Sequence, residues 1–436
     1  MKKLANTFIL CSLVAFIGSV SAQEYRNDST EENKKKNDLP DRLTIGGYGE
    51  AVLSRNFYSD QWQRYTNAEQ YKDAKNHGRF DLPHVVLSIG YDFGKGWSFG
   101  SEIEFEHGGT GSAVEIEAEE TGEYETETER GGEVVLEQFW IQKSFCDAFN
   151  IRMGHIIVPV GMTNQYHLPT EFFTNYRPEG ESTILPCTWH ETGISLWGRT
   201  KNWRYEILFL PGLDADRFDS EGFISGGSGS PYEFKIANAY AGALRLDNYS
   251  IKNLRVGVSG YFGNSFSNSL SKNTKYKDYN GEVMIGTIDF HYKTRRLIAR
   301  GNFDWAHLND SEEITQFNKS MSNASPSPKM AVASDAVAAG IEMGYDIFSH
   351  ISKMRRDDRK LYLFGRYEYY DAMAKVEKNV LDYGWCGKQR MALGLNYYPL
   401  KEIVVKAEYS KRFYKSQYNN EPTVSLGIAY AGFFTK

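Results

Sequence analysis

The sequence predicts an all-β protein, a transmembrane antiparallel β-barrel of about 16 strands with long extracellular loops and short periplasmic turns. Three observations predict this fold class. Strand-like segments follow one another along the chain and are joined alternately by short turns and long polar loops. A secretion signal precedes them, and no apolar run after it is long enough for a membrane helix. Aromatic residues make up 14% of the chain although its mean hydropathy is −0.52, as expected where only alternate strand residues face lipid.

The chain divides by composition into three parts. Residues 1–22 are predicted to be a signal peptide, because Lys2 and Lys3 precede an apolar run that ends in small residues. Residues 23–42 are charged and lack apolar periodicity, and we expect them to form a short disordered periplasmic tail. Residues 43–436 carry the strand pattern and contain no linker that would divide them into separate domains.

The first eight strands are expected at residues 43–57, 79–92, 97–107, 134–145, 149–158, 190–199, 203–211 and 237–246. Each has roughly the nine or more residues that a tilted membrane strand needs. Alternation is clear in the third strand, where Trp97 and Phe105 fall on one face and Glu104 falls on the other. This period of two predicts one apolar and one polar face.

The last eight strands are expected at residues 254–262, 281–292, 297–308, 337–348, 361–371, 389–398, 404–414 and 423–434. In the third of them, Phe303 and Trp305 oppose Asp304 across the strand. A soluble β-sandwich would show the same alternation. The barrel is favoured because rings gather at the short-turn ends of the strands, where a membrane-interface girdle needs them. These rings belong to Tyr91, Phe93, Trp97, Phe145, Phe149, Phe290, Tyr292, Tyr397, Tyr398, Phe433 and Phe434.

Charge and motifs exclude several classes of function. The formal net charge is −6, which argues against nucleic acid as a partner. The sequence contains no Gly-x-Ser-x-Gly nucleophile elbow, no His-Glu-x-x-His zinc motif and no phosphate-binding glycine loop. His155 and the pair His190-Glu191 are the only residues in the sequence that suggest catalysis. We therefore expect no enzyme, no cofactor and no protein-bound metal.

An acidic loop follows the third strand. Its glutamates alternate with Val, Ile, Ala and Thr, which suggests a hairpin that projects beyond the membrane. These carboxylates, within residues 115–129, could hold surface-bound divalent cations, including ions that bridge lipopolysaccharide. A solvated, self-repelling loop is the simpler interpretation. Two cysteines in other long loops, Cys187 and Cys386, could pair, but sequence alone does not establish that they are close.

The loop at residues 159–189 is the best candidate for a pore constriction. A barrel of about sixteen strands encloses an aqueous channel unless something narrows it. The loop and the strand before it offer aromatic rings and charges suited to a sugar or a small organic solute. The candidate selectivity residues are Arg152, Tyr166, His167, Phe172, Phe173, Tyr176, Arg177 and Glu179. The alternative is that they only pack the loop against the barrel wall, or, for Arg152, form a wall salt bridge.

The inward faces of the predicted strands carry charges of both signs. The candidate pore-wall residues are Glu102, Glu104, Arg204, Arg255, Arg300, Asp304, Arg366 and Glu368. Anion selectivity arises from rings or clusters of one sign, and neither sign prevails here. A mixed wall predicts either fields across the channel or charges that pair with one another.

Specific stretches near the constriction loop carry a resemblance. They are residues 152–161 (Arg-Met-Gly-His-Ile-Ile-Val-Pro-Val-Gly), the loop with Leu168-Pro169, and residues 193–196 (Gly-Ile-Ser-Leu). With the strand pattern, they resemble the phosphate-selective porin O and P family in its Bacteroidetes-like branch. The resemblance implies a sixteen-stranded homotrimeric channel with a loop folded into its lumen. The C-terminal alternation that ends at Phe434 also resembles an outer-membrane assembly signal, although Thr435 and Lys436 follow the aromatic residue.

Two functions from different classes fit these features. The first is an outer-membrane porin of a Gram-negative bacterium, through which small hydrophilic solutes such as ions, phosphate, sugars or small organic acids diffuse passively. Its expected partners are outer-membrane lipid, lipopolysaccharide and two further copies of the chain. The second is a surface-binding or adhesive barrel whose long loops bind a polymer or a host ligand. Solute flux across a membrane separates the two.

Overall fold

A computed structural model describes residues 42–74, 77–108, 111–118, 124–131, 134–229, 235–269, 272, 274–322, 325 and 327–435. For 111–118 and 124–131 the description covers the backbone. The predicted signal peptide (1–22) and the predicted tail up to residue 41 lie outside the described residues.

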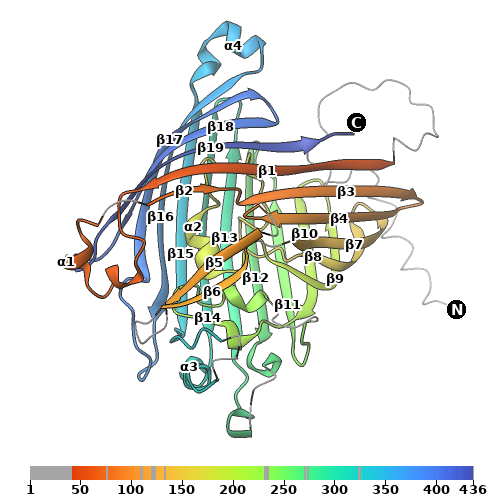
Figure 1. Cartoon of the computed structure of the whole chain (residues 1–436). Helices are drawn as coiled ribbons and strands as arrows, with labels where there is room; N and C mark the ends of the chain where they lie inside the picture. The colour runs from red at the N-terminus through yellow and green to blue at the C-terminus, as the bar shows by residue number, and fades with distance from the viewer. Residues whose placement is uncertain are drawn as a thin grey trace, which may run out of the picture.

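The strands form a closed antiparallel barrel, as predicted (Figure 1). The strands of its first half are β1 (Leu43–Asn56), β2 (His77–Asp81), β3 (His84–Gly94), β4 (Trp97–Glu106), β7 (Val134–Cys146), β8 (Phe149–Ile157), β9 (His190–Arg199), β10 (Trp203–Pro211) and β11 (Tyr240–Asn248). Those of its second half are β12 (Leu254–Asn264), β13 (Glu282–Lys293), β14 (Leu297–Leu308), β15 (Asp335–Asp346), β16 (Lys360–Lys375), β17 (Gly387–Leu400), β18 (Ile403–Phe413) and β19 (Glu421–Phe433). β2 and β3 both pair with β1, and the other barrel strands pair with their neighbours in the order given. β1 also pairs with β19, from Gly46↔Phe433 to Asn56↔Thr423, which closes the barrel.

One predicted strand is interrupted. Residues 79–92 were expected to form a single strand, but Pro83 lies between β2 and β3. β3 pairs with the first half of β1, and β2 pairs with its second half. Proline has no N–H to donate to a sheet ladder, so it marks a natural break in the strand. The two pieces together occupy one of the sixteen positions around the barrel.

The barrel has apolar side chains on its outer face and charged side chains inside, the reverse of a soluble protein. Large apolar residues point outward, as Leu393 (62% exposed), Leu426 (52%) and Phe303 (51%) do. Charged residues point inward and are buried, with Arg245 and Asp304 both 0% exposed. Rings at the short-turn ends are exposed and contact one another, for example Phe145 with Phe149 at 5.2 Å between ring centres. An apolar outer band with aromatic rings at its edge identifies a barrel of the outer membrane.

The connections hold the remaining elements. The predicted acidic hairpin is present as β5 (Gly111–Ala118) paired with β6 (Tyr124–Gly131). Its carboxylates, the proposed ligands for surface divalent cations, lie outside the described side chains. The helices are short: α1 (Ala68–Tyr71), α2 (Glu179–Ile184), α3 (Ser311–Lys319) and α4 (Ser352–Arg356). Among the described residues, no helix has the length and apolar character to cross a membrane. Cys146, Cys187 and Cys386 are free, so Cys187 and Cys386 do not pair.

Candidate functional site

The segment between β8 and β9, residues 158–189, lies inside the barrel. None of these residues is exposed, although they form a long connection between two strands. The segment includes α2, which lies against the inner side of β15 and β16 (Figure 1). Loops normally run over a surface, because a buried backbone needs partners for its polar groups. The barrel wall supplies those partners, as the contacts of this inward loop (158–189) show.

Near its start, the inward loop contains a glycine that the geometry requires. Gly161 has a φ of +84°, in the region that favours glycine, and a Cβ there would overlap the Glu181 carboxylate. Its N–H donates to Ser259 Oγ at 2.9 Å, and its carbonyl accepts from Arg245 Nη1 at 2.8 Å. Glu181 Oε1 also accepts from the N–H of Thr163 at 2.9 Å. The stretch 152–161 that carries the resemblance ends at this residue, and these contacts explain why glycine is needed there.

The middle of the inward loop is fixed to β15, β16 and β18. Phe172 and Phe173 are 2% and 1% exposed, so their rings face the wall rather than an open channel. The Phe173 ring stacks on Phe364 at 5.5 Å, and its N–H donates to Glu342 Oε2 at 3.2 Å. Lys406 Nζ donates to the carbonyl oxygen of Phe172 at 3.1 Å. For these two aromatic residues, the structure therefore favours the alternative that they pack the loop against the wall.

Glu179, at the start of α2, contacts two positively charged side chains of the wall. Its Oε1 lies 2.5 Å from Arg412 Nε, and its Oε2 lies 3.2 Å from Arg390 Nε. The Tyr370 hydroxyl also donates to Glu179. One turn of helix thus brings an anionic side chain to two wall arginines. The N–H of Gly180 adds a bond to Glu368 Oε1 at 3.0 Å.

Charges on the wall from β10 to β19 pair with one another. Arg204 and Arg245 both contact Asp247, and Arg245 also contacts Asp289 at 2.9 Å. Further along the wall, Arg300 lies 2.6 Å from Glu342. The chain of pairs continues through Arg366–Glu368, Arg390–Glu368, Arg390–Glu408 and Arg412–Glu421. Of the two interpretations of a mixed wall, paired charges describe this part of the barrel, which we call the paired wall (β10–β19).

The predicted pore-wall residues divide between the paired wall and a second region. Arg204, Arg255, Arg300, Arg366 and Glu368 belong to the paired wall, where Arg255 contacts both Asp247 and Asp289. Asp304, fully buried on the same wall, accepts from Asn302 Nδ2 at 2.5 Å, and its other oxygen has no hydrogen-bond partner. Glu102 and Glu104 lie on β4, in the second region.

Carboxylates dominate that second region, which we call the acidic sector and define as Glu50, Glu102, Glu104, Glu106 and Glu137. Within the described part of the chain, Glu102 and Glu137 form no ion pair, and Glu50 and Glu104 pair only with His84. Glu102 accepts hydrogen bonds from Ser88 and Gln138, and Glu137 accepts from Tyr48 and Thr188. These neutral donors bind the carboxylates without balancing their charge.

Three polar residues of the inward loop lie on the side of this sector. Tyr176 donates to Asp81 Oδ2 at 3.2 Å, and the His167 ring packs edge-on against Tyr48 at 5.8 Å. Arg177 forms no ion pair with a described residue, and its Nε and Nη2 have no hydrogen-bond partner. Tyr166 lies on the opposite side, with Arg255 4.7 Å from its ring centre. The predicted selectivity residues are therefore spread over both sides of the barrel.

Arg152 lies on β8, at the barrel wall. It lies between the rings of Trp140 and Trp197, 4.6 Å and 5.6 Å from their centres, and Nε donates to Gln142 Oε1 at 3.0 Å. Register explains this position, because Arg152 pairs with Gln142 near the short turn at Cys146, away from the start of the loop. These contacts are those of a wall residue, and a role of Arg152 in the narrow zone stays a prediction.

Glu137 is a member of the acidic sector that sequence reasoning missed. It is 2% exposed and lies at a bulge, where the pairing of β4 with β7 shifts between Glu102 and Ile103. A bulge adds one residue to one strand and changes which side chains face inward beyond it. Nothing in the alternation of β7 signals that extra residue.

Comparison with known proteins places the fold. A high-pH structure of OprB from Pseudomonas putida superposes with a TM-score of 0.55 at 11% identity and covers 90% of this chain and 95% of that one. The outer membrane channel DcaP of Acinetobacter baumannii gives 0.50 at 12% identity (89% and 97%). An anion-selective porin from Comamonas acidovorans gives 0.50 at 10% identity (89% and 99%). The chain has the fold of an outer-membrane porin.

No protein-family model matches the chain. An uncharacterised protein of Aquifex aeolicus (strain VF5) is 25% identical over 392 residues, which cover 87% of this chain and 78% of that protein.

Proposed function

We propose that this protein is an outer-membrane porin through which small hydrophilic solutes diffuse passively. The observation that carries the proposal is the inward loop, held at lumen depth by hydrogen bonds and ion pairs to the wall rather than by apolar packing alone. A barrel that served only to display external loops would gain nothing from this arrangement. A channel gains a narrowed and chemically defined passage.

We further propose that the chain belongs with the phosphate-selective porin O and P family in architecture, on the resemblance of residues 152–161 and 193–196. The paired wall argues against phosphate as its particular solute. Arg245 and Arg300 are 0% and 4% exposed, and both already contact carboxylates. An arginine that is committed to a buried carboxylate offers little to a passing phosphate.

The solutes we propose are neutral or positively charged. The paired wall balances its own charges, whereas the acidic sector carries carboxylates without a Lys or Arg ion pair to Glu50, Glu102, Glu104 or Glu137 among the described residues. Uncompensated charge of one sign at a narrow zone selects for ions of the other sign. A moderate preference for cations over anions is therefore expected, with small sugars also admitted.

The test is the reversal potential of the purified, refolded protein in a planar bilayer under a potassium chloride gradient. A stable conductance with a potential of the sign for potassium supports both the channel and the acidic sector as its selectivity element. A potential of the opposite sign would keep the channel and move weight to phosphate-type selectivity. Correctly folded protein without conductance would overturn the porin proposal and favour the surface-binding barrel.

We also propose that the protein is a homotrimer in contact with outer-membrane lipid and lipopolysaccharide. The support is the family resemblance, together with an exposed apolar outer face that suits either lipid or a neighbouring copy. Light scattering in detergent, corrected for bound detergent, measures the mass directly. A monomer under conditions that preserve conductance would contradict the trimer and leave the channel proposal intact.

A further inference from the structure

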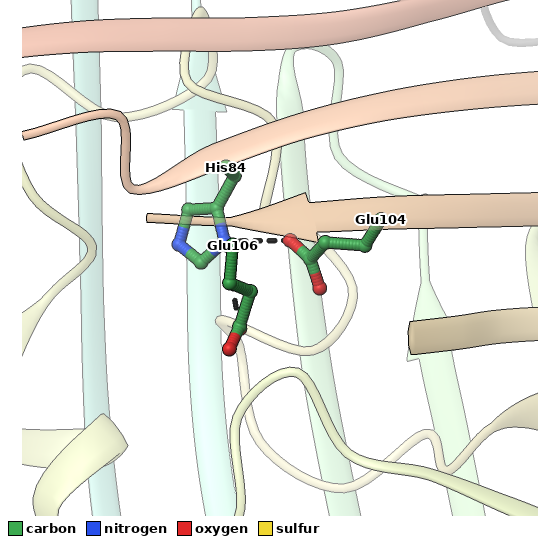
Figure 2. A group of neighbouring side chains, drawn as sticks. All are labelled: His84, Glu104 and Glu106. Carbon is green, nitrogen blue, oxygen red and sulfur yellow. Dashed lines mark hydrogen bonds and ion pairs between the residues drawn. The ribbon is translucent and has the colours of Figure 1, made fainter. Parts of the chain in front are cut away.

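A histidine and two glutamates in the acidic sector have the geometry of a metal site. His84 begins β3 and lies opposite Glu106 of β4 in register, with Glu104 diagonal to it. Because residues two apart on a strand share a face, Glu104 and Glu106 point to the same side as His84 (Figure 2). Nδ1 of His84 lies 2.6 Å from Glu104 Oε1 and 3.9 Å from Glu106 Oε1. The three potential ligand atoms all lie within 4.8 Å of one another.

A fourth residue, Glu50 of β1, points to this cluster independently. It is 5% exposed, one of its carboxylate oxygens has no hydrogen-bond partner, and the other lies 4.0 Å from Nε2 of His84. Metal-binding histidines commonly direct their second ring nitrogen to a carboxylate, which fixes the tautomer and makes the first nitrogen a better ligand. Glu50 occupies the position of that carboxylate, on the opposite side of the ring from Glu104 and Glu106.

The break between β2 and β3 explains how these side chains meet. The pairing of β1 with β3 ends at Gly49↔Val85, so Glu50 and His84 are the next residue on each strand at the interruption beside Pro83. No ladder continues there, and the side chains of three strands turn toward one point of the inner wall. An ion bound at that point would link β3 to β4 directly and β1 through Glu50.

Charge favours an ion as well. Glu104 is 3% exposed and lies beside the buried carboxyl group of Glu137. Arg177 is a positive neighbour of both, but it makes no ion pair with them. Buried carboxylates are expected to be paired or to coordinate a metal, because an isolated buried charge is costly. A divalent cation would balance two of them at once.

We propose that His84, Glu104 and Glu106 bind a divalent transition-metal cation, with Glu50 orienting the histidine. Imidazole with carboxylates suits ions such as Zn²⁺ rather than Ca²⁺ or Mg²⁺, which prefer an all-oxygen shell. Three protein ligands leave further positions for water. The Glu106 side chain is 34% exposed, so the ion can enter and leave from the lumen. This site is additional to solute diffusion and does not depend on it.

The first test is calorimetric titration of the refolded full-length protein with zinc chloride in metal-free buffer, with calcium chloride in parallel. One Zn²⁺ per chain and no comparable calcium binding are expected. Loss of an outer-shell partner alone weakens metal sites by about 10–100-fold, so Glu104→Gln and His84→Ala should each weaken Zn²⁺ binding by at least that factor. Glu50→Gln should weaken it by about tenfold.

The matched control is Glu102→Gln, which changes the preceding inward carboxylate of the same strand and should retain Zn²⁺ binding. The contact between His155 and His190, 2.6 Å between Nε2 and Nδ1, is another place where Zn²⁺ could bind. Zinc affinity unchanged in His84→Ala and Glu104→Gln would overturn the proposal. Equal affinity for calcium that is insensitive to His84→Ala would also overturn it, because a diffuse acidic surface behaves in that way.

A second measurement needs no variant and therefore does not depend on variants that fold. Anomalous diffraction from wild-type crystals soaked in zinc chloride should show a peak between His84 and Glu104. Absence of a peak at that position, or a peak only at His155 and His190, would contradict the site.

Discussion

Lys406 Nζ donates to the carbonyl oxygen of Phe172 at 3.1 Å and lies 4.3 Å from the centre of the Phe172 ring. It also donates to the carbonyl of Thr174 at 2.7 Å. This lysine is only 2% exposed. It donates hydrogen bonds to two backbone carbonyl groups of the inward loop and also contacts the face of an aromatic ring between them. The loop is pinned to β18 by one buried cation, and its position depends on polar contacts of this kind.

Replacing that cation should loosen the loop. Lys406→Met keeps the length of the side chain and leaves two buried carbonyl groups without their donor, which costs about 1–3 kcal/mol per unsatisfied group. We expect a larger and noisier single-channel conductance with the barrel intact. The control is Lys411→Met, which changes a lysine on the same strand that lies near the Phe413 ring at 4.9 Å. Conductance identical to wild type in Lys406→Met would show that the loop does not narrow the channel.

Arg177 should determine how strongly the channel prefers cations. It is the charged loop residue that lies beside the acidic sector, and two of its guanidinium nitrogens have no hydrogen-bond partner. A unit charge about 4 Å from an ion changes its energy by about 1 kcal/mol even in water, so Arg177→Gln should raise the cation-to-anion permeability ratio by roughly threefold to tenfold. The measurement is the reversal potential in a potassium chloride gradient.

Removing a negative charge beside the paired wall should have the opposite effect on ion selectivity. Glu179→Gln removes an anion that contacts Arg390 and Arg412, so it should shift the reversal potential toward anions. Two variants that move the potential in the same direction would show that it responds to loop disorder rather than to charge.

Gly161→Ala should destabilise the entry of the inward loop. The φ of +84° costs a residue with a Cβ about 1–2 kcal/mol, and overlap with Glu181 adds to this cost. We expect a lower midpoint of urea unfolding, followed by the heat-dependent gel mobility of the folded barrel. Gly286→Ala is the control, because no atom lies within 4 Å of a Cβ built there. An equal loss in both variants would mean that barrel strands, and not the loop entry, set the midpoint.

The barrel could be predicted because its signal is local. β14 has the predicted bounds, 297–308, since Phe303 and Trp305 alternate with Asp304 on a strand without irregularities. β11 starts three residues later than expected, at Tyr240, because residues 237–239 are apolar or small but belong to the preceding loop. Pro83 was a visible signal for the break between β2 and β3, and it was missed because the residues on both sides alternate well.

The site was less predictable because its contacts are distant in sequence. Composition identified the inward loop as a candidate, but which rings face the wall depends on partners such as Phe364 and Glu342, far along the chain. The metal candidate brings together Glu50, His84 and Glu104 from three strands at a break in the ladder. No short sequence motif predicts that these three residues come together. A bulge such as the one at Glu137 changes which side chains of a strand point into the barrel, and no local sequence pattern indicates it.

The last prediction concerns the long loop after β10, outside the membrane-spanning strands. Asp214 is 5% exposed, and burial, together with the charge of Asp216, raises its pKa to about 7. An unfolded Asp has a pKa of about 3.9, so the folded loop binds more protons than the unfolded loop between these values. The stability that Asp214 contributes is therefore fully present below pH 4 and is lost as pH rises through 7, by up to about 4 kcal/mol.

Amide hydrogen exchange of residues 212–229, corrected for its intrinsic pH dependence, measures this effect. Protection in the wild-type protein should fall between about pH 4 and pH 7, the window between the pKa of an unfolded Asp and the raised pKa of Asp214. Asp214→Asn keeps an oxygen that can accept from the N–H of Asp216, a bond of 3.1 Å, but cannot ionise, so its protection should vary much less with pH. Asp382→Asn, in a different long loop, should leave the wild-type pH dependence in place. A slope that persists unchanged in Asp214→Asn would assign the titration to another carboxylate of the loop, such as Asp216 or Asp219, whose pKa values burial also raises.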